Sequence, residues 1–244
     1  MSANGAPTRL VLWDVDHTLI VAWDFHKKLY RDAFTQMTAR PPDRMVDMSG
    51  RPDRASTTDM LQANGVEPTE DQLKRFSACL AWAMDHNRDH LRHAGRQAAG
   101  AERVLQVLAG RPDVAQTLVT GNLRYLAEVK LETLGLDGHL DYSIGGYGWD
   151  AIERWRLVEV AKERASAKYG VQFTEVNTVV LGDTPKDVDA ALRGGAAMIA
   201  VATGLTDVAG LQAAGAHLVL PDLEDVERVV GAIDEMTAAV GRLG

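Results

Sequence analysis

The chain has 244 residues, of which 46% are hydrophobic and 25% charged, and its formal net charge is -8 at pH 7. This is the composition of an ordinary soluble globular protein, long enough for one large domain or a core domain with an insertion, and its negative charge argues against nucleic acid as a partner. The single cysteine, Cys79, excludes a disulfide within the chain, the first residues lack the apolar core of a secretory signal, and no apolar stretch is long enough to span a bilayer. We therefore expect a cytoplasmic protein that binds no membrane.

The stretch from Arg9 to Leu19 carries the first chemical signal. Residues 10–13 form a continuous apolar run, typical of a strand buried on both faces of a parallel sheet, and Asp14 and Asp16 follow it directly. If the chain stays extended, its two-residue period points both carboxylates to one side, at the strand end where open α/β sheets bind ligands. The pair predicts a site for a hard cation, and a polar turn is the alternative because aspartate is common in turns.

The chain after this stretch reads as helical as far as about residue 95. Apolar residues three or four apart predict a helix from Asp24 to Met37, which ends before Pro41 and Pro42, and two further helices over 52–64 and 69–93. We expect residues 23–95 to form an all-helical cap domain, inserted into a core made of residues 1–22 and 96–244.

From Gly100 onward, helices alternate with short apolar strands. The predicted helices cover 101–109, 123–134, 153–169, 187–193, 207–214 and a last one from 223, and the predicted strands cover 114–119, 142–144, 178–181, 198–201 and 217–219. This alternation indicates parallel strands joined by right-handed crossovers, so the expected fold class is α/β with a doubly wound parallel sheet.

Two of these strands end in polar residues suited to phosphate and metal. Thr120 could donate a hydrogen bond to an anionic oxygen, and Gly121 and Asn122 would open the next helix with free N–H groups; an ordinary helix N-cap is the alternative. Asp183 ends a second strand and Asp187 begins the following helix, so both could complete a magnesium site opposite the first pair. We expect Asp189 to be a solvated or capping residue in the first turn of that helix, where the helix dipole favours an acid.

A basic residue is expected beside these carboxylates. The segment 145–154 contains three glycines, which allow a close, mobile loop, and Arg154 follows that loop. Arg154 could neutralise a phosphate and the crowded aspartates. Arg156 and Lys130 are rivals for this role, and an exposed helical side chain is the alternative for each.

The ordered set of motifs resembles the haloacid dehalogenase-like superfamily, in particular the phosphoglycolate phosphatase-like group with a helical cap inserted after the first strand. The resemblance covers essentially the whole chain and rests on four stretches: Asp-x-Asp-x-Thr at 14–18, Thr-Gly-Asn at 120–122, the basic residue near 154, and Gly-Asp-Thr-Pro-x-Asp at 182–187. It implies a Rossmann-like core, an aspartyl-phosphate mechanism and Mg²⁺ as cofactor.

The resemblance also implies individual roles. Asp14 would be the nucleophile and Asp16 the general acid and base, while Thr120 and Arg154 would bind the phosphate. The magnesium ligands would be the carboxylates of Asp14, Asp183 and Asp187, with the backbone carbonyl of Asp16.

Two positions depart from the family pattern. His17 stands where the family usually has glycine, and it could contact the substrate or point away from it; Arg154 lacks the usual Lys-Pro context. In the cap, His26, Lys27 and Arg51 are candidate substrate contacts, and each could equally be a solvated surface residue.

Three histidines in the cap, His86, His90 and His93, are spaced to lie on one helix face. That spacing could bind zinc, but charged residues surround the three and no outside ligand is evident. We favour an exposed polar face.

Together these features predict a magnesium-dependent phosphatase acting on a small phosphorylated metabolite. The alternatives are a phosphotransferase or phosphomutase of the β-phosphoglucomutase type, which would share Asp14 and Asp16, and a non-catalytic binding or regulatory protein on the same fold. A dehalogenase is disfavoured because it would have little use for Asp16. The sequence names neither the substrate nor the oligomeric state.

Overall fold

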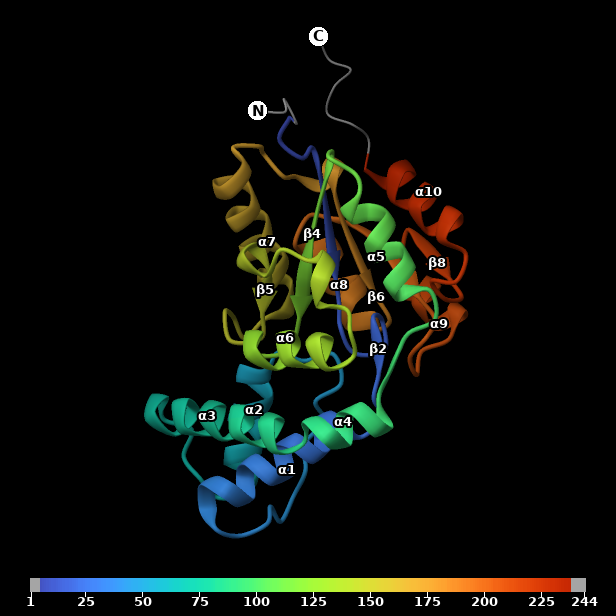
Figure 1. The fold of residues 1–244 in the computed structure, drawn as a ribbon. Helices are drawn as coiled ribbons and strands as arrows, with labels where there is room; N and C mark the ends of the chain where they lie inside the picture. Colours follow the sequence, from blue (N-terminus) through green and yellow to red (C-terminus); the bar gives the residue numbers. More distant parts are fainter. Residues whose placement is uncertain (1–4, 238–244) are drawn as a thin grey trace.

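The computed structural model describes residues 5–237, and its centre is a six-stranded parallel sheet (Figure 1). The strand order is β5-β4-β1-β6-β7-β8, and the strands are β1 (Arg9–Trp13), β4 (Val114–Thr120), β5 (Gly146–Tyr147), β6 (Thr178–Gly182), β7 (Ala197–Val201) and β8 (Leu218–Leu220). Trp13 pairs with Leu118 on one side and Leu181 on the other, so β1, β4 and β6 end at the same edge. The expected α/β class with a doubly wound sheet is confirmed.

Helices cover both faces of the sheet because successive residues of each buried strand point to opposite sides. Val11 and Trp13 pack with α5 (Ala101–Ala109) and α10 (Val226–Met236). Leu10 and Leu12 pack on the other face with α7 (Arg154–Tyr169), α8 (Pro185–Arg193) and α9 (Val208–Ala213). The helix α6 (Arg124–Thr133) lies beside the carboxyl ends of the strands in Figure 1.

A helical segment leaves and rejoins this core through two short strands, β2 (Ile20–Val21) and β3 (Arg96–Gln97), which pair antiparallel. Between them lie α1 (Phe25–Thr38), α2 (Asp53–Ala63), α3 (Glu70–His86) and α4 (Arg88–Ala94), and these helices sit below α6 in Figure 1. They share an apolar core that includes Phe25, Phe34 and Phe76, and this core continues into α6 through Leu126 and Val129.

The expected elements are present except in two places, and their ends differ by at most three residues. The strand predicted at 142–144 is wrong: Asp141 accepts a hydrogen bond from the Ser143 N–H (3.1 Å), which turns residues Tyr142–Ile144 into a short 3-10 helix. The strand β5 follows instead at Gly146–Tyr147.

The helix predicted over 69–93 is two helices. The side-chain amide of Asn87 donates to the Ala83 carbonyl (2.8 Å) and to Asp32 (2.9 Å), so it competes with the backbone and ends α3. The strands β2 and β3 were not predicted.

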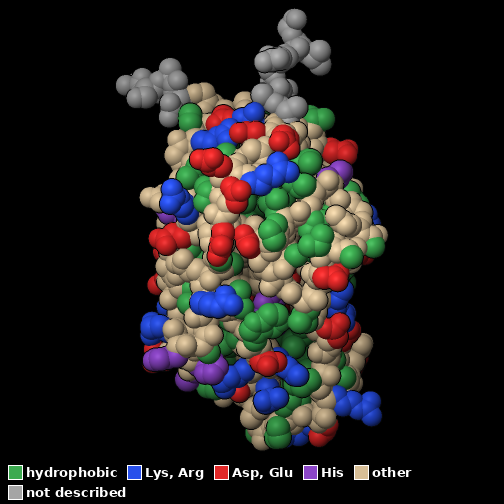
Figure 2. Space-filling view, turned by 90° about the vertical axis from the view of Figure 1, so that its right-hand side faces the viewer, with side chains coloured by type: hydrophobic (Ala, Val, Ile, Leu, Met, Phe, Trp, Pro, Cys, Tyr) green, Lys and Arg blue, Asp and Glu red, His purple; other side chains and the backbone are tan. Residues whose placement is uncertain are grey.

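The surface carries charged side chains of both signs, as the composition of the sequence predicts. Figure 2 shows acidic and basic side chains interspersed over one face of the molecule. Within residues 5–237, no helix combines the length and hydropathy needed to cross a bilayer.

Candidate active site

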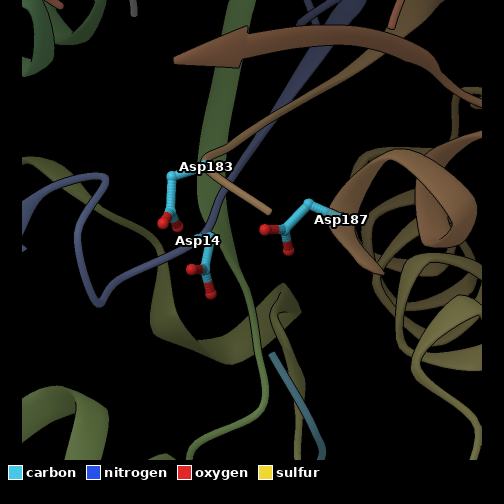
Figure 3. Close-up of side chains that lie close together, drawn as sticks. All are labelled: Asp14, Asp183 and Asp187. Carbon is cyan, nitrogen blue, oxygen red and sulfur yellow. The ribbon is translucent and has the colours of Figure 1, made fainter. Parts of the chain in front are cut away.

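Three buried carboxylates converge at the common edge of β1 and β6. Asp14 follows β1, Asp183 follows β6, and Asp187 lies in the first turn of α8, where its carboxylate accepts hydrogen bonds from the Thr184 N–H (3.0 Å) and hydroxyl (2.6 Å). Each offers one oxygen, and these oxygens lie within 4.8 Å of one another (Figure 3). It is the one such acidic, histidine or cysteine cluster in the described part of the chain.

The electrostatics of this cluster favour a bound cation. Burial, followed by repulsion from Asp187, raises the pKa of Asp14 well above its usual range, and burial with repulsion from Asp187 and Asp14 does the same for Asp183. Crowded carboxylate oxygens are the ligands that hard divalent cations prefer. The donor set therefore fits Mg²⁺, and the carboxylate of Asp16 is not part of it.

Arg154, the first residue of α7, lies against the same acids. Its Nη2 donates to Asp14 (2.8 Å) and to Asp187 (2.6 Å), and its Nε donates to Asp187 (2.9 Å). These buried ion pairs raise the pKa of Arg154 even though burial opposes the charge. The rival Arg156 is exposed, and its ion pair is with Glu153 (3.7 Å) and not with an acid of the cluster.

Lys130, the other rival, is fully buried and pairs with the second aspartate of the motif. Its Nζ donates to Asp16 Oδ1 (2.8 Å) and Oδ2 (2.7 Å) and to Asn122 Oδ1 (2.7 Å). Burial alone would raise the pKa of Asp16, but the ammonium of Lys130 holds it below the usual range. Two cations thus share the site, Arg154 on the Asp14 side and Lys130 on the Asp16 side.

The signal for Lys130 was present in the sequence. It lies four residues after Leu126 and one before Leu131, on the stripe of α6 that is buried. A lysine on a buried stripe needs an acidic partner.

The segment Thr120–Asn122 connects the phosphate candidates to Asp16. The Asn122 side-chain amide donates to Thr120 Oγ1 (2.7 Å) and to Asp16 (2.8 Å), and the Asn122 backbone N–H also donates to Thr120 Oγ1 (3.3 Å). Since Thr120 accepts in these bonds, its hydroxyl proton is left for a donor role. The helix α6 begins after its cap residue, Leu123, so the prediction that Gly121 and Asn122 open this helix with free N–H groups is wrong, and so is the N-cap alternative.

The Leu123 N–H is bound by Asp53, a residue that was not predicted as a site residue. Asp53 begins α2, is fully buried, and accepts hydrogen bonds from the Leu123 N–H (2.6 Å) and the Tyr30 hydroxyl (2.9 Å). Its other neighbour is His26, whose Nε2 lies 3.0 Å from Asp53 and whose Nδ1 lies 3.4 Å from Lys130 Nζ. A polar network therefore runs from the helical segment to Asp16.

Glycines bring the loops of the site into close contact. A Cβ at Gly182 would meet the Asp187 side chain, one at Gly204 would overlap the Asp183 carboxylate, and one at Gly121 would meet the Arg51 carbonyl. In the predicted glycine-rich loop, a Cβ at Gly148 would overlap the Gly121 carbonyl, so that loop packs closely on the site. Gly204 carries no sequence signal because it acts on a residue far away in the chain.

A cavity of about 650 Å³ opens above these residues. Its lining includes Asp14, Asp16, Thr120, Arg154 and Asp183, together with the predicted cap contacts His26, Lys27 and Arg51. Arg51 also forms an ion pair with Asp59 (2.6 Å). The structure thus brings the predicted site residues to one cavity, with Asp187 beneath it.

The remaining candidates lie elsewhere. His86, His90 and His93 are exposed and do not converge, since the break at Asn87 divides them between α3 and α4. Asp189 is exposed, as predicted, and it pairs with Arg193 (3.4 Å).

Comparison with known proteins identifies the family. Residues 11–192, which hold the whole acidic cluster, match the family model of the haloacid dehalogenase-like hydrolases. The chain belongs to this family. Among curated proteins, none matches the chain by sequence.

Solved structures show that the haloacid dehalogenase-like fold extends over nearly the whole chain. A predicted phosphatase from Clostridium acetobutylicum is 18% identical with a TM-score of 0.63, covering 94% of this chain and 100% of its own. A predicted phosphoglycolate phosphatase from Haemophilus somnus is 16% identical with a TM-score of 0.62 and covers 94% and 100%. A protein assigned as a β-phosphoglucomutase from Thermotoga maritima is 18% identical with a TM-score of 0.56 and covers 92% and 99%.

Proposed function

We propose that this chain is a Mg²⁺-dependent phosphatase that hydrolyses a small phosphorylated metabolite through an aspartyl-phosphate. The observation that carries the proposal is the convergence of Asp14, Asp183 and Asp187 with Arg154, three of which, all but Asp187, line one cavity. The predicted phosphatases with the same fold support it.

In this mechanism the two aspartates of the first motif have different tasks. Asp14 attacks phosphorus, so that its carboxylate oxygen bonds to phosphorus as the ester P–O bond breaks. Asp16 gives a proton to the leaving alkoxide and then takes one from the water that attacks phosphorus and releases Asp14. Because Lys130 favours ionised Asp16, the acid step requires a proton, and the negative charge of an incoming phosphate favours its uptake.

The remaining residues would bind the phosphate or the metal ion and would orient the reacting groups. Thr120 and Arg154 would bind the oxygens of the phosphoryl group that is transferred, and Asn122 would hold Thr120 and Asp16 in fixed positions relative to each other. Asp14, Asp183 and Asp187, with the backbone carbonyl of Asp16, would hold Mg²⁺, which would offset the repulsion between carboxylate and phosphate when bound.

We propose further that residues 23–95 act as a cap over the core residues 1–22 and 96–244. Residues from both parts line the cavity, which supports this division. In such an arrangement the core residues bind the phosphoryl group, and the cap residues His26 and Arg51 contact the leaving group. The single cysteine and the net charge favour a cytoplasmic enzyme with a small-molecule substrate.

Phosphate release from p-nitrophenyl phosphate tests the proposal. Asp14→Asn should abolish release in the presence of Mg²⁺ while the circular dichroism spectrum stays unchanged. Asp189→Asn, the same change at an exposed acid, should retain activity. Near-wild-type turnover by Asp14→Asn, or activity that chelator does not reduce, would contradict the nucleophile or the metal assignment.

A phosphomutase is the second candidate, and the fold shared with a protein assigned as a β-phosphoglucomutase favours keeping it. Incubation with a sugar phosphate separates the two. Inorganic phosphate supports the hydrolase, whereas an isomerised sugar phosphate without inorganic phosphate supports the mutase.

A further inference from the structure

His17 has an unusual backbone conformation next to the proposed acid and base. Its φ is 64°, in the left-handed region that favours glycine, and its backbone is held there by a hydrogen bond from its own N–H to the Ile20 carbonyl (2.6 Å) and by the Thr203 hydroxyl, which donates to its carbonyl. A side chain kept in this conformation is a candidate for a functional role.

The imidazole ring of His17 packs against the exposed indole ring of Trp23. Its ring centroid lies 4.0 Å from that of Trp23, with the planes at 34°, and its Nδ1 is buried without a hydrogen-bond partner among the described residues. Trp23 remains 50% exposed. Both side chains line the cavity that contains Asp14 and Asp16.

The cavity that holds this pair is also lined by apolar side chains. Ala22, Val46, Met48 and Leu205 line it, and Leu205 is 84% exposed. Large apolar side chains exposed within a polar cleft indicate a contact surface for a ligand. A phosphate ester bound at Asp14 would place its bridging oxygen at Asp16, and the atoms beyond that oxygen would extend into the cavity that Trp23 and these apolar residues line.

We propose that Trp23, supported by His17, is the platform on which the leaving group lies, so that the preferred substrates are phosphate esters whose leaving group has a flat apolar face. An aromatic ring and a sugar ring share this chemistry. The proposal rests on the proposed function, because it takes the phosphate to be held at Asp14, Thr120 and Arg154.

Binding of two phosphonates with Mg²⁺ tests the platform without turnover, because the P–C bond is not hydrolysed. By isothermal titration calorimetry, the wild type should bind phenylphosphonate roughly tenfold more tightly than methylphosphonate, as expected for one stacked ring. Trp23→Ala should lose that preference while binding methylphosphonate within about twofold of wild type, and Trp23→Phe should retain most of it. Tyr125→Ala, which removes a 40% exposed aromatic outside this cavity, is the matched control.

His17→Gly provides a variant that keeps the fold, because glycine suits the positive φ. It should reduce the preference for phenylphosphonate several-fold with an unchanged or higher melting temperature. Hydrolysis rates then identify the leaving group. If Trp23→Ala loses activity toward phenyl phosphate alone, the leaving group is aromatic. If it loses activity toward glucose 6-phosphate relative to glycerol 3-phosphate, the leaving group is a sugar.

Three results would overturn the platform: no preference in the wild type, an equal loss of both phosphonates in Trp23→Ala, or a preference that survives that change. If neither phosphonate binds to the wild type, the phosphate site fails as well, and the proposed function falls with the platform. Tight methylphosphonate binding without a phenyl preference removes the platform alone.

Discussion

The ion pair between Lys130 and Asp16 can be removed with little change of shape by Lys130→Met. Removing one partner of a buried ion pair costs about 3–5 kcal/mol, because the other charge is left without compensation. The Lys130 side chain is fully buried but that of Asp16 is 30% exposed, so water can solvate part of the remaining charge. We expect the free energy of unfolding at pH 7 to fall by about 3 kcal/mol, the lower end of that range.

The pH dependence of this loss follows from the pKa of Asp16. In the wild type that pKa is lowered on folding, so its stabilising contribution is present above about pH 4 and is lost as the pH falls through the lowered pKa. In Lys130→Met, burial without the ammonium raises the pKa, so ionised Asp16 destabilises the folded state at neutral pH. The difference between the two proteins should therefore be largest near pH 7 and shrink toward pH 4.

Urea denaturation followed by circular dichroism at pH 7, 5.5 and 4 measures this difference. Lys162→Met is the control, because Lys162 donates only to the carbonyls of Gly194 (2.9 Å) and Gly195 (2.8 Å) and pairs with no carboxylate in the described structure. A loss below about 1 kcal/mol at pH 7, or one that does not change with pH, would refute the assignment of the pair as a buried electrostatic contact.

Three further changes probe the acidic cluster and the helical segment. The pKa of Asp183 is raised to about 9 in the metal-free fold, so its contribution to stability is present at low pH and is lost as the pH rises, by up to about 1 kcal/mol per pH unit. Between pH 6 and 9 in the presence of chelator, thermal unfolding should therefore show a smaller loss of stability in Asp183→Asn than in the wild type. Gly204→Ala should displace the Asp183 carboxylate and weaken Mg²⁺ activation of phosphatase activity by roughly tenfold or more, whereas Gly231→Ala, whose Cβ would meet nothing within 4 Å, should leave it unchanged; equal activation in both would contradict the contact. Asp53→Ala should lower the free energy of unfolding by about 2 kcal/mol in urea, since it leaves the buried Leu123 N–H and Tyr30 hydroxyl without their acceptor, and an unchanged midpoint would show that water replaces it.

The sequence predicts the part of the site that lies on regular elements. Asp14 and Asp183 follow strands and Thr120 ends one, and the apolar runs of these strands are long enough to identify. Parallel strands must end at one edge, so the convergence of the three residues follows from the fold class. The strand β5 could not be placed in this way. Its two residues are fixed by pairing with β4 and by the turn at Asp141, and neither effect is visible in local hydropathy.

Contacts between distant segments explain what the sequence did not predict. Asp53 looks like an ordinary first-turn helix acid, yet its carboxylate binds the start of a different helix. Gly204 is one of 22 glycines, and only the position of Asp183 gives it a role. Lys130 was one of the candidate basic residues, but the sequence alone does not say which acid it would meet.

The contact that Asp53 makes with the core has a consequence for how the enzyme would exchange substrate and product. Besides its carboxylate bond to Leu123, the Asp53 N–H donates to the Gly121 carbonyl (2.7 Å), and the adjacent Arg54 N–H donates to the Gly148 carbonyl (2.9 Å). Any separation of α2 from these loops breaks all three bonds together, because they leave from consecutive residues of one helix. Opening would thus be a cooperative, all-or-none step, and the waiting time for that step would set an upper limit on turnover however fast the phosphoryl chemistry is.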